Sequence, residues 1–274
     1  MKIAVLITCF NRRVITEACL HAFFAAQENS NLEFDVYLTD GGSSDGTPEI
    51  IRQKFPSVSV FEKDNLYWNE GMIHSWGEAS ANAYEGFLLL NDDLHINLRT
   101  LFNLQETIFN CGNSLLIVGR TISAVTGKTT YGALSPVKGL SKLRFSLAFD
   151  SGGEPITMNG NFVYVPKSIY DVIGKLSARF RHGMGDIDYG LRARKSGFSI
   201  TELPTPVGNQ EYNYEWSNRN RYLTFRNFRH ILMDPKGVPI REWLYFCRVH
   251  GGFLWPINFL MRYFFSFRKK CVPS

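Results

Sequence analysis

Short aliphatic runs alternate with amphipathic stretches along the first 110 residues. Residues 2–8, 34–38 and 58–62 are apolar runs of strand length, and apolar positions at helical spacing follow each of them. A fourth run, residues 87–90, continues the alternation. Strands that alternate with helices form β-α-β units and a parallel sheet. We therefore expect an α/β fold with a mostly parallel, Rossmann-like sheet flanked by helices.

The pattern changes after residue 110. Residues 115–119 and a run within 158–166 are further strand candidates, whereas 120–157 are irregular and predict short strands and loops that cover the sheet. A helix with Asp186 in its first turn is expected to end at Gly197. No internal repeat or low-complexity tract is visible, so we expect a globular architecture.

The run at 87–90 ends abruptly in Asn91-Asp92-Asp93. We expect both carboxylates at the rim of the sheet, where the carboxyl ends of parallel strands open on a ligand crevice. Adjacent carboxylates repel each other, and a divalent cation that also binds substrate phosphates relieves the repulsion. The alternative is a solvated turn or a helix N-cap.

Two loops near this edge have unusual composition. Residues 39–47 combine two aspartates with glycines before a helix, which is typical of a nucleotide site, although a glycine-rich turn capped by Thr47 is an alternative. The loop 63–72 carries Tyr67, Trp68 and two asparagines. It predicts a sugar or base pocket, but Trp68 is equally expected to fill the core beneath a helix at 73–84.

A third acidic candidate is Asp186, which lies beside two glycines that allow a substrate to come near. A carboxylate in such a position can act as a general base for an incoming hydroxyl. Asp188 lies in the same first turn, where acids commonly complement the helix dipole.

Composition changes the picture mainly at the C-terminus. The 274 residues, 45% hydrophobic and 20% charged, suit one large or two modest globular domains. The net charge of +5 is concentrated in the last quarter of the chain and favours an anionic partner. Five cysteines without C-x-x-C spacing indicate a reducing cytoplasm. The apolar start, residues 3–10, lacks a small-residue cleavage site and predicts a buried strand instead of a signal peptide.

The segment 243–267 mixes aromatic residues with cations and a proline. Charges interrupt it too often for a transmembrane helix, so it predicts an amphipathic segment at a membrane interface; a helix pair packed on the domain is the alternative. Arginines in 208–231 suit phosphate or anionic lipid, with a solvated basic helix as the default. A nucleic-acid partner is not expected because the cations accompany membrane-like sequence.

Several motifs in order resemble family 2 glycosyltransferases of the GT-A fold, particularly bacterial enzymes of O-antigen and capsule synthesis. Thr8-Cys9-Phe10-Asn11-Arg12 is similar to the end of the family's first strand, and residues 40–47 resemble its aspartate-glycine-serine element. Asn91-Asp92-Asp93 stands at its D-x-D-type triplet, and Asp186 at the aspartate of its glutamate-aspartate motif, with Gly185 replacing the glutamate. The likeness covers about residues 1–230.

The resemblance implies a role for each matched residue. Asp40 would read the nucleobase, Asp93 would hold Mn²⁺ or Mg²⁺, and Asp186 would deprotonate the acceptor. The residues assigned to donor binding are Thr8, Phe10, Asn11, Arg12, Asp40, Asn65, Trp68, Gly71, Asn91 and Asp92. Those assigned to the acceptor or its phosphate are Asp188, Asn209 (in place of a family histidine), Tyr222 and Arg226.

By this resemblance we expect an inverting transfer from a UDP or dTDP sugar to a glycan or lipid-linked glycan. The catalytic domain would span residues 1–205, with the nucleotide sugar on 1–110 and the acceptor on 111–205. Residues 206–274 would form a C-terminal helical extension on the anionic inner face of a bacterial membrane. The rival functions are a sugar nucleotidyltransferase, which would need a glycine-rich loop after the first strand, and a non-catalytic sugar-binding module.

Overall fold

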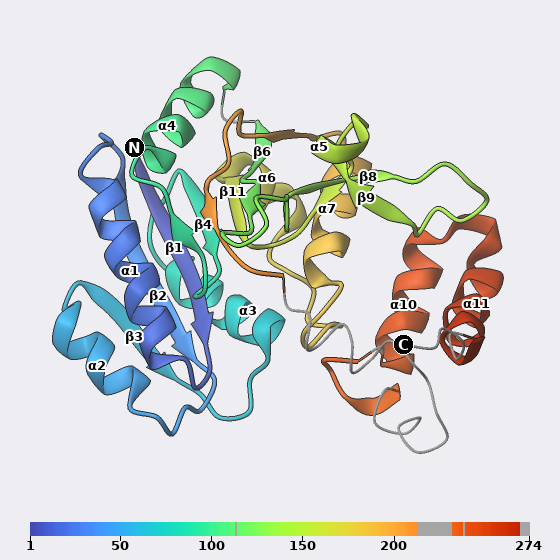
Figure 1. The fold of residues 1–274 in the computed structure, drawn as a ribbon, viewed down its shortest axis with the longest axis horizontal. Coiled ribbons are helices and arrows are strands. Elements are labelled where there is room, and N and C mark those ends of the chain that lie inside the picture. The colour runs from blue at the N-terminus through green and yellow to red at the C-terminus, as the bar shows by residue number, and fades with distance from the viewer. Residues whose placement is uncertain (113, 213–231, 238, 269–274) are drawn as a thin grey trace.

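A seven-stranded sheet forms the centre of the molecule (Figure 1). The computed structural model describes residues 1–112, 114–212, 232–237 and 239–268. In sheet order the strands are β12 (Ser199–Glu202), β6 (Leu115–Val118), β11 (Phe162–Pro166), β4 (Gly86–Leu90), β1 (Lys2–Cys9), β2 (Glu33–Asp40) and β3 (Val58–Glu62). The strands expected from the apolar runs are all present.

The pairing of these strands is mostly parallel. β1 runs parallel to β2 and to β4, β2 runs parallel to β3, and β12 runs parallel to β6. Only β11 is antiparallel to its neighbours β4 and β6. The expected α/β fold with a mostly parallel sheet is confirmed, and the carboxyl ends of β1, β2 and β4 lie at one edge.

Helices cover both faces of the sheet. On one face lie α1 (Arg13–Gln27), α2 (Thr47–Lys54) and α4 (Thr100–Cys111), and on the other lie α3 (Trp68–Ala79), α6 (Lys167–Ile173) and α7 (Gly185–Lys195). The side chains of β1 divide between the two resulting cores, with Ile3, Val5 and Ile7 in one and Ala4 and Leu6 in the other. Because alternate residues of a strand point to opposite faces, a strand covered on both faces reads as one continuous apolar run.

Two small sheets occupy the region that the sequence predicted to be irregular. One contains β10 (Thr157–Met158), β8 (Ala133–Pro136) and β9 (Phe145–Leu147), followed by the short helix α5 (Ala148–Ser151). The other contains β5 (His95–Ile96), β13 (Gly208–Asn209) and β7 (Thr121–Ile122). β13 therefore joins strands of the expected catalytic domain although it follows residue 205. The domain boundary at that residue stays a prediction.

Helix α3 begins earlier than the sequence predicted. We expected a loop over 63–72 and a helix from residue 73, but α3 starts at Trp68. The physical reason is a capping box, in which the Glu70 carboxylate accepts a hydrogen bond of 3.1 Å from the Tyr67 backbone N–H. Such a cap satisfies backbone donors that the first helical turn leaves unpaired. Trp68 is thereby held at the helix N-terminus.

The C-terminal part forms α10 (Ile240–His250), the 3-10 turn η1 (Gly252–Leu254) and α11 (Trp255–Arg268). Trp243 and Phe246 of α10 are buried in a small apolar cluster with Phe180. His250 Nε2 lies 2.8 Å from a carboxylate oxygen of Asp188 in α7. α10 is therefore packed on the domain, as the alternative for this segment predicted. None of the helices within the described residues combines the length and hydropathy needed to cross a bilayer.

A close contact joins the N-termini of α3 and α7. The Asn69 carboxamide Nδ2 donates hydrogen bonds to the carbonyl oxygens of Ser177 (3.0 Å) and Phe180 (2.7 Å). A Cβ added at Gly185 would overlap Asn69 Oδ1. Gly185, where the resembled family has glutamate, is thus required here by the neighbouring asparagine.

We predict that Gly185→Ala lowers the free energy of unfolding by about 1–3 kcal/mol, because overpacking displaces the carboxamide or the helix. Urea denaturation measures the change. Gly183→Ala is the matched control, since nothing lies within 4 Å of a Cβ at that position. In the Asn69→Ala background the penalty of Gly185→Ala should shrink to under about 1 kcal/mol. Equal penalties in both backgrounds would contradict this explanation.

Candidate active site

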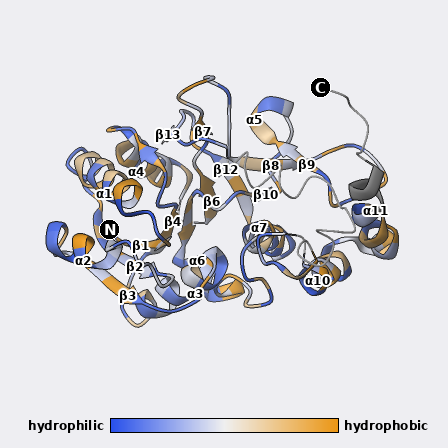
Figure 2. Ribbon diagram, turned by 60° about the horizontal axis from the view of Figure 1, so that its bottom comes forward, coloured by the Kyte–Doolittle hydropathy of each residue, from blue (hydrophilic) through white to orange (hydrophobic). Residues whose placement is uncertain are grey.

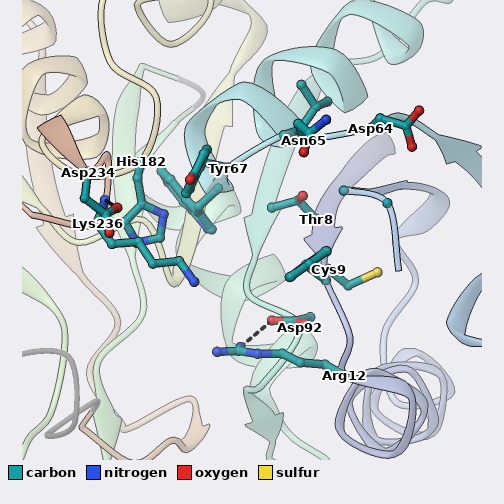
Figure 3. Close-up of a pocket in the computed structure, with 15 residues that line it drawn as sticks. Thr8, Cys9, Arg12, Asp64, Asn65, Tyr67, Asp92, His182, Asp234 and Lys236 are labelled. Carbon is teal, nitrogen blue, oxygen red and sulfur yellow. Dashed lines mark hydrogen bonds and ion pairs between the residues drawn. The ribbon is translucent and has the colours of Figure 1, made fainter. Parts of the chain in front are cut away.

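A cavity of about 520 Å³ opens at the carboxyl edge of β1 (Figure 3). Its walls come from the end of β1 and the loop after it, the loops after β2, β3 and β4, the start of α3 and two segments later in the chain. The lining residues are Thr8, Cys9, Phe10, Arg12, Gly41, Gly42, Asp64, Asn65, Leu66, Tyr67, Trp68, Asp92, His182, Asp234 and Lys236. Most of the residues predicted to bind a donor therefore line or border one cavity.

The end of β1 and the loop after it contribute four of the predicted donor residues. Thr8, Phe10 and Arg12 line the cavity directly. Asn11, at a φ of 50°, accepts a hydrogen bond of 2.8 Å from the Ser44 N–H at its Oδ1, and its own N–H donates to Ser43 Oγ at 2.7 Å. Asn11 thus links the first loop to the glycine-rich loop instead of facing the cavity.

Gly71 in α3 has a packing role beside Thr8. A Cβ at this position would overlap the Thr8 side chain. The glycine therefore lets the helix approach the end of β1 and keeps the Thr8 side chain at the cavity wall. The assignment of Gly71 to donor binding stays a prediction. In this structure Gly71 affects the cavity through the position of the Thr8 side chain.

Asp40 is buried and holds the shape of the glycine-rich loop. Its Oδ2 accepts hydrogen bonds from the N–H groups of Gly42 (3.0 Å) and Ser43 (2.7 Å). Gly42 needs its positive φ of 97° for this turn, since L residues with side chains rarely adopt it. The cavity wall is formed by Gly41 and Gly42. The role of Asp40 in reading a nucleobase stays a prediction.

Trp68 connects the cavity to the triplet after β4. Its indole Nε1 donates a hydrogen bond of 2.7 Å to Asn91 Oδ1, while the ring packs against the core under α3. The indole therefore lines the cavity and also covers the core, while its part in binding a sugar or base stays a prediction. Asn65, at a φ of 59°, lines the cavity from the loop before α3.

Arg12 bridges the two carboxylates of the triplet. Its Nη1 lies 3.0 Å from Asp92 Oδ1 and 3.0 Å from Asp93 Oδ2, and Figure 3 shows the first of these contacts. We expected both carboxylates at the rim, and for Asp92 this was wrong: its side chain is 7% exposed, against 30% for Asp93. Asp92 can be buried because Arg12 and the Thr16 hydroxyl (3.4 Å) bind it.

Burial has an electrostatic consequence for Asp92. It raises the pKa of this carboxyl to about 7, although the positive charge of Arg12 acts in the opposite direction. The same ion pairs raise the pKa of the Arg12 guanidinium, although burial acts to lower it. The positive charge of Arg12 is therefore shared between the carboxyl groups of Asp92 and Asp93.

The side chain that contacts Asp93 from the C-terminal half is Gln210, next to the predicted Asn209. Gln210 Nε2 donates a hydrogen bond to Asp93 Oδ1, and Gln210 Oε1 accepts one of 2.8 Å from Asn161. Asn209 itself lies in β13. The polar run 208–210 was the available signal, and pairing of β13 with β5 decides which member faces Asp93. Tyr222 and Arg226 lie outside the described residues.

Asp186 lies in the first turn of α7 and packs against Gly160, as Trp68 does. Its Oδ2 accepts a hydrogen bond of 3.0 Å from the Gly160 N–H, and its Oδ1 accepts one of 2.8 Å from the Ile187 N–H. A Cβ at Gly160 would meet Trp68 Cη2 at 2.5 Å and Asp186 Cβ at 3.2 Å, so these three residues are packed together. Burial raises the pKa of Asp186 despite the two hydrogen bonds.

Asp188 points away from this group. Its carboxylate is buried and accepts a hydrogen bond of 2.8 Å from Arg192 Nε, with His250 Nε2 at 2.8 Å on the other oxygen. These contacts attach α10 to α7. A direct contact with an acceptor stays a prediction and would require some of these bonds to break.

Three cavity residues were not predicted from the sequence. His182, Asp234 and Lys236 form the wall opposite Arg12 and Asp92 (Figure 3). Burial lowers the pKa of His182 to about 4, with Lys236 acting in the same direction, so this imidazole is neutral at pH 7. These residues belong to segments without periodic pattern, and only the tertiary fold brings them to the cavity.

The donor set bears on the metal that the resemblance implies. Within the described ranges no group of three or more His, Cys, Asp or Glu side chains forms a ready-made metal site. Asp92 and Asp93 nevertheless hold a cation between them, the Arg12 guanidinium. The half-exposed Asp93 carboxylate suits Mg²⁺ or Mn²⁺ when water and substrate phosphates supply the other ligands. The residues thus fit an ion shared with a substrate.

Comparison with known proteins agrees with the fold. The chain resembles the crystal structure of S. aureus TarS with a TM-score of 0.57 at 14% identity, and the match covers 98% of this chain and 44% of that chain. TarS 1-349 in complex with UDP and in complex with UDP-GlcNAc each give a TM-score of 0.58 at 15% identity. These matches cover 98% of this chain and 73% and 74% of the TarS fragment. The fold is accordingly GT-A.

A search of curated proteins found no match to the sequence. The sequence profile described as glycosyl transferase family 2 matches residues 4–166, which include β1, the glycine-rich loop, the Asn91-Asp92-Asp93 triplet and β11. This span is more than half of the 274 residues. The chain therefore belongs to glycosyl transferase family 2.

Proposed function

We propose that the protein is an inverting glycosyltransferase that moves a sugar from a nucleotide diphosphate to a glycan or lipid-linked glycan hydroxyl, in synthesis of a bacterial surface polysaccharide such as O antigen or capsule. The observation that supports the proposal is that Asp186 and Trp68 both pack against Gly160. Trp68 lines the same cavity as Arg12 and Asp92. In this proposal the Trp68 indole lies between the carboxylate that would act as base and the charged residues that would bind the diphosphate.

The donor in this proposal is a UDP or dTDP sugar. The TarS fragment binds UDP and UDP-GlcNAc, and this supports a nucleotide sugar in the corresponding fold. The cavity offers a glycine-rich wall for the nucleotide at Gly41 and Gly42 and an aromatic wall at Tyr67 and Trp68. Glycine backbones permit close approach, and aromatic faces suit bases and sugar rings.

Asp186 is the base in the proposed reaction. The acceptor hydroxyl gives its proton to the carboxylate as its oxygen forms a bond with the anomeric carbon, and the bond from that carbon to the diphosphate oxygen breaks. The raised pKa of Asp186 makes the carboxylate a stronger base than an ordinary aspartate. A divalent cation bound by Asp93 would supply positive charge to the departing nucleoside diphosphate.

We predict that Asp186→Asn lowers kcat by ~10²-fold or more while UDP affinity stays within about twofold, because the variant loses the base and leaves the cavity intact. Steady-state transfer assays and calorimetry with UDP provide the two numbers. Asp171→Asn, on the exposed surface of α6, is the control. Normal turnover in Asp186→Asn would remove the base assignment. Slow release of UDP from donor without acceptor would distinguish a transferase from a binding module.

The membrane part of the proposal rests on an apolar surface at the C-terminal end of the molecule. Figures 1 and 2 show α11 at the end opposite α2. Phe253 in η1 is 97% exposed, and Leu140 in the β8–β9 loop is 88% exposed. The Lys142 side chain lies 3.5 Å from an added Cβ at Gly252, so this loop and η1 are neighbours. The α11 residues Ile257, Leu260 and Met261 are also exposed.

Cations surround this apolar surface. Lys138, Lys142 and Arg144 are exposed in the β8–β9 loop, and Arg248 is exposed on α10. Exposed apolar side chains with a rim of cations suit the headgroup region of an anionic bilayer. We propose that the protein works in the cytoplasm, on the inner face of the bacterial membrane, bound through this surface.

We predict that Phe253→Glu weakens binding to phosphatidylglycerol-containing vesicles by roughly tenfold, because it replaces the exposed ring that would insert into the bilayer with a charge. Vesicle sedimentation measures the binding. Phe109→Glu is matched, since Phe109 is 77% exposed on the distant α4. Equal effects of the two substitutions, or no binding by the unmodified protein, would contradict the membrane proposal. Point variants are preferable to deletion because α10 is part of the core.

A further inference from the structure

We propose that Arg12 occupies the cation position between Asp92 and Asp93 in the donor-free protein, and that the divalent ion displaces it from Asp93 and turns it toward the donor's diphosphate. This inference rests on the proposed function and adds that binding of the ion and binding of the donor are linked through Arg12. The ion and Arg12 compete when donor is absent. They act together when donor is present.

The first argument is the geometry of the bridge. A single nitrogen, Arg12 Nη1, lies 3.0 Å from an oxygen of each carboxylate. Within the described part of the chain, Arg12 is the one basic side chain in an ion pair with either acid. One guanidinium therefore supplies the charge that a divalent ion would supply to the same two groups, and a divalent ion bound at Asp93 would repel the guanidinium.

The second argument is the difference in exposure between the two acids. The side chain of Asp92 is 7% exposed and also accepts from Thr16, whereas that of Asp93 is 30% exposed. An ion that enters from solvent thus reaches Asp93 more readily than Asp92. Displacement from Asp93 leaves Arg12 tethered to the buried Asp92.

The third argument is the position of Arg12 itself. The residue lines the cavity, and its side chain is 37% exposed. The bridge uses only Nη1, so the rest of the guanidinium is available to rotate toward a ligand. Guanidinium groups bind phosphate oxygens through paired N–H donors. A diphosphate in the cavity is the ligand whose charge matches a released Arg12.

The test measures Mn²⁺ binding and UDP binding separately. The proposal predicts that loss of Arg12 changes the two affinities in opposite directions. Mn²⁺ binding without nucleotide is measured by the loss of the free Mn²⁺ signal in electron paramagnetic resonance. UDP binding in saturating Mn²⁺ is measured by calorimetry. Arg12→Ala should tighten Mn²⁺ binding by at least about tenfold, because a competing cation is gone. The same variant should weaken UDP binding by about tenfold or more.

Two further variants complete the design. Arg12→Lys keeps a cation between the acids, so its Mn²⁺ affinity should stay close to that of the unmodified protein, and it also guards against misfolding of the alanine variant. Arg13→Ala removes the same charge from the next, exposed residue and should change neither affinity.

Weaker or unchanged Mn²⁺ binding in Arg12→Ala, including absence of binding in every variant, would overturn the proposal. A purely structural or phosphate-binding arginine predicts that outcome. If the unmodified protein fails to bind UDP, the proposed function fails instead, while the Mn²⁺ measurement still decides whether Arg12 competes with the ion.

Discussion

The parallel pairing of β1 with β2 and β4 is the constraint on which the site depends. Cys9 at the end of β1 pairs with Asp40 at the end of β2, and β4 ends on the other side of β1 just before Asn91. Three loops therefore leave the sheet at one edge. Polar and charged residues after these strands converge without being close in sequence, as in other open α/β sheets.

The antiparallel strand β11 adds the fourth contribution. Phe162 at its start pairs with Leu90 at the end of β4, so Gly160 and Asn161 lie at the same edge. The Gly160 N–H then donates to Asp186, and Asn161 donates to Gln210, which in turn contacts Asp93. One antiparallel strand thus connects helix α7 to the acidic triplet.

The strands and the acidic residues at the sheet edge could be predicted from the sequence because both depend on local pattern. Strands that helices cover on both faces appear in the sequence as continuous apolar runs, and the change from Leu90 to Asn91 marks the end of one such strand. The early start of α3 also had a local signal, since Glu70 follows Tyr67 by three residues. The burial of Asp92 had none, because it requires Arg12, 80 residues away. Gln210 and His182 likewise reach the site through tertiary contacts.

The packing between α3 and α7 explains why position 185 is glycine, whereas sequence comparison alone gives no reason for it. Gly185 stands where a glutamate is usual, and Asn69 occupies the space that its Cβ would need. Asn69 also holds the carbonyls of Ser177 and Phe180, which precede the helix that carries Asp186. The proposed base, Asp186, and the indole of Trp68 are therefore positioned by the same packing between α3 and α7.

A crystal structure of the protein with UDP and Mn²⁺ tests the central claim, the convergence of these groups on one donor cavity, most directly. The account predicts the diphosphate in the cavity between Arg12 and Trp68, with its terminal β-phosphate, which carries the sugar in a UDP-sugar donor, turned toward Asp186. A nucleotide bound elsewhere, or a diphosphate whose outer phosphate points away from Asp186, would contradict it.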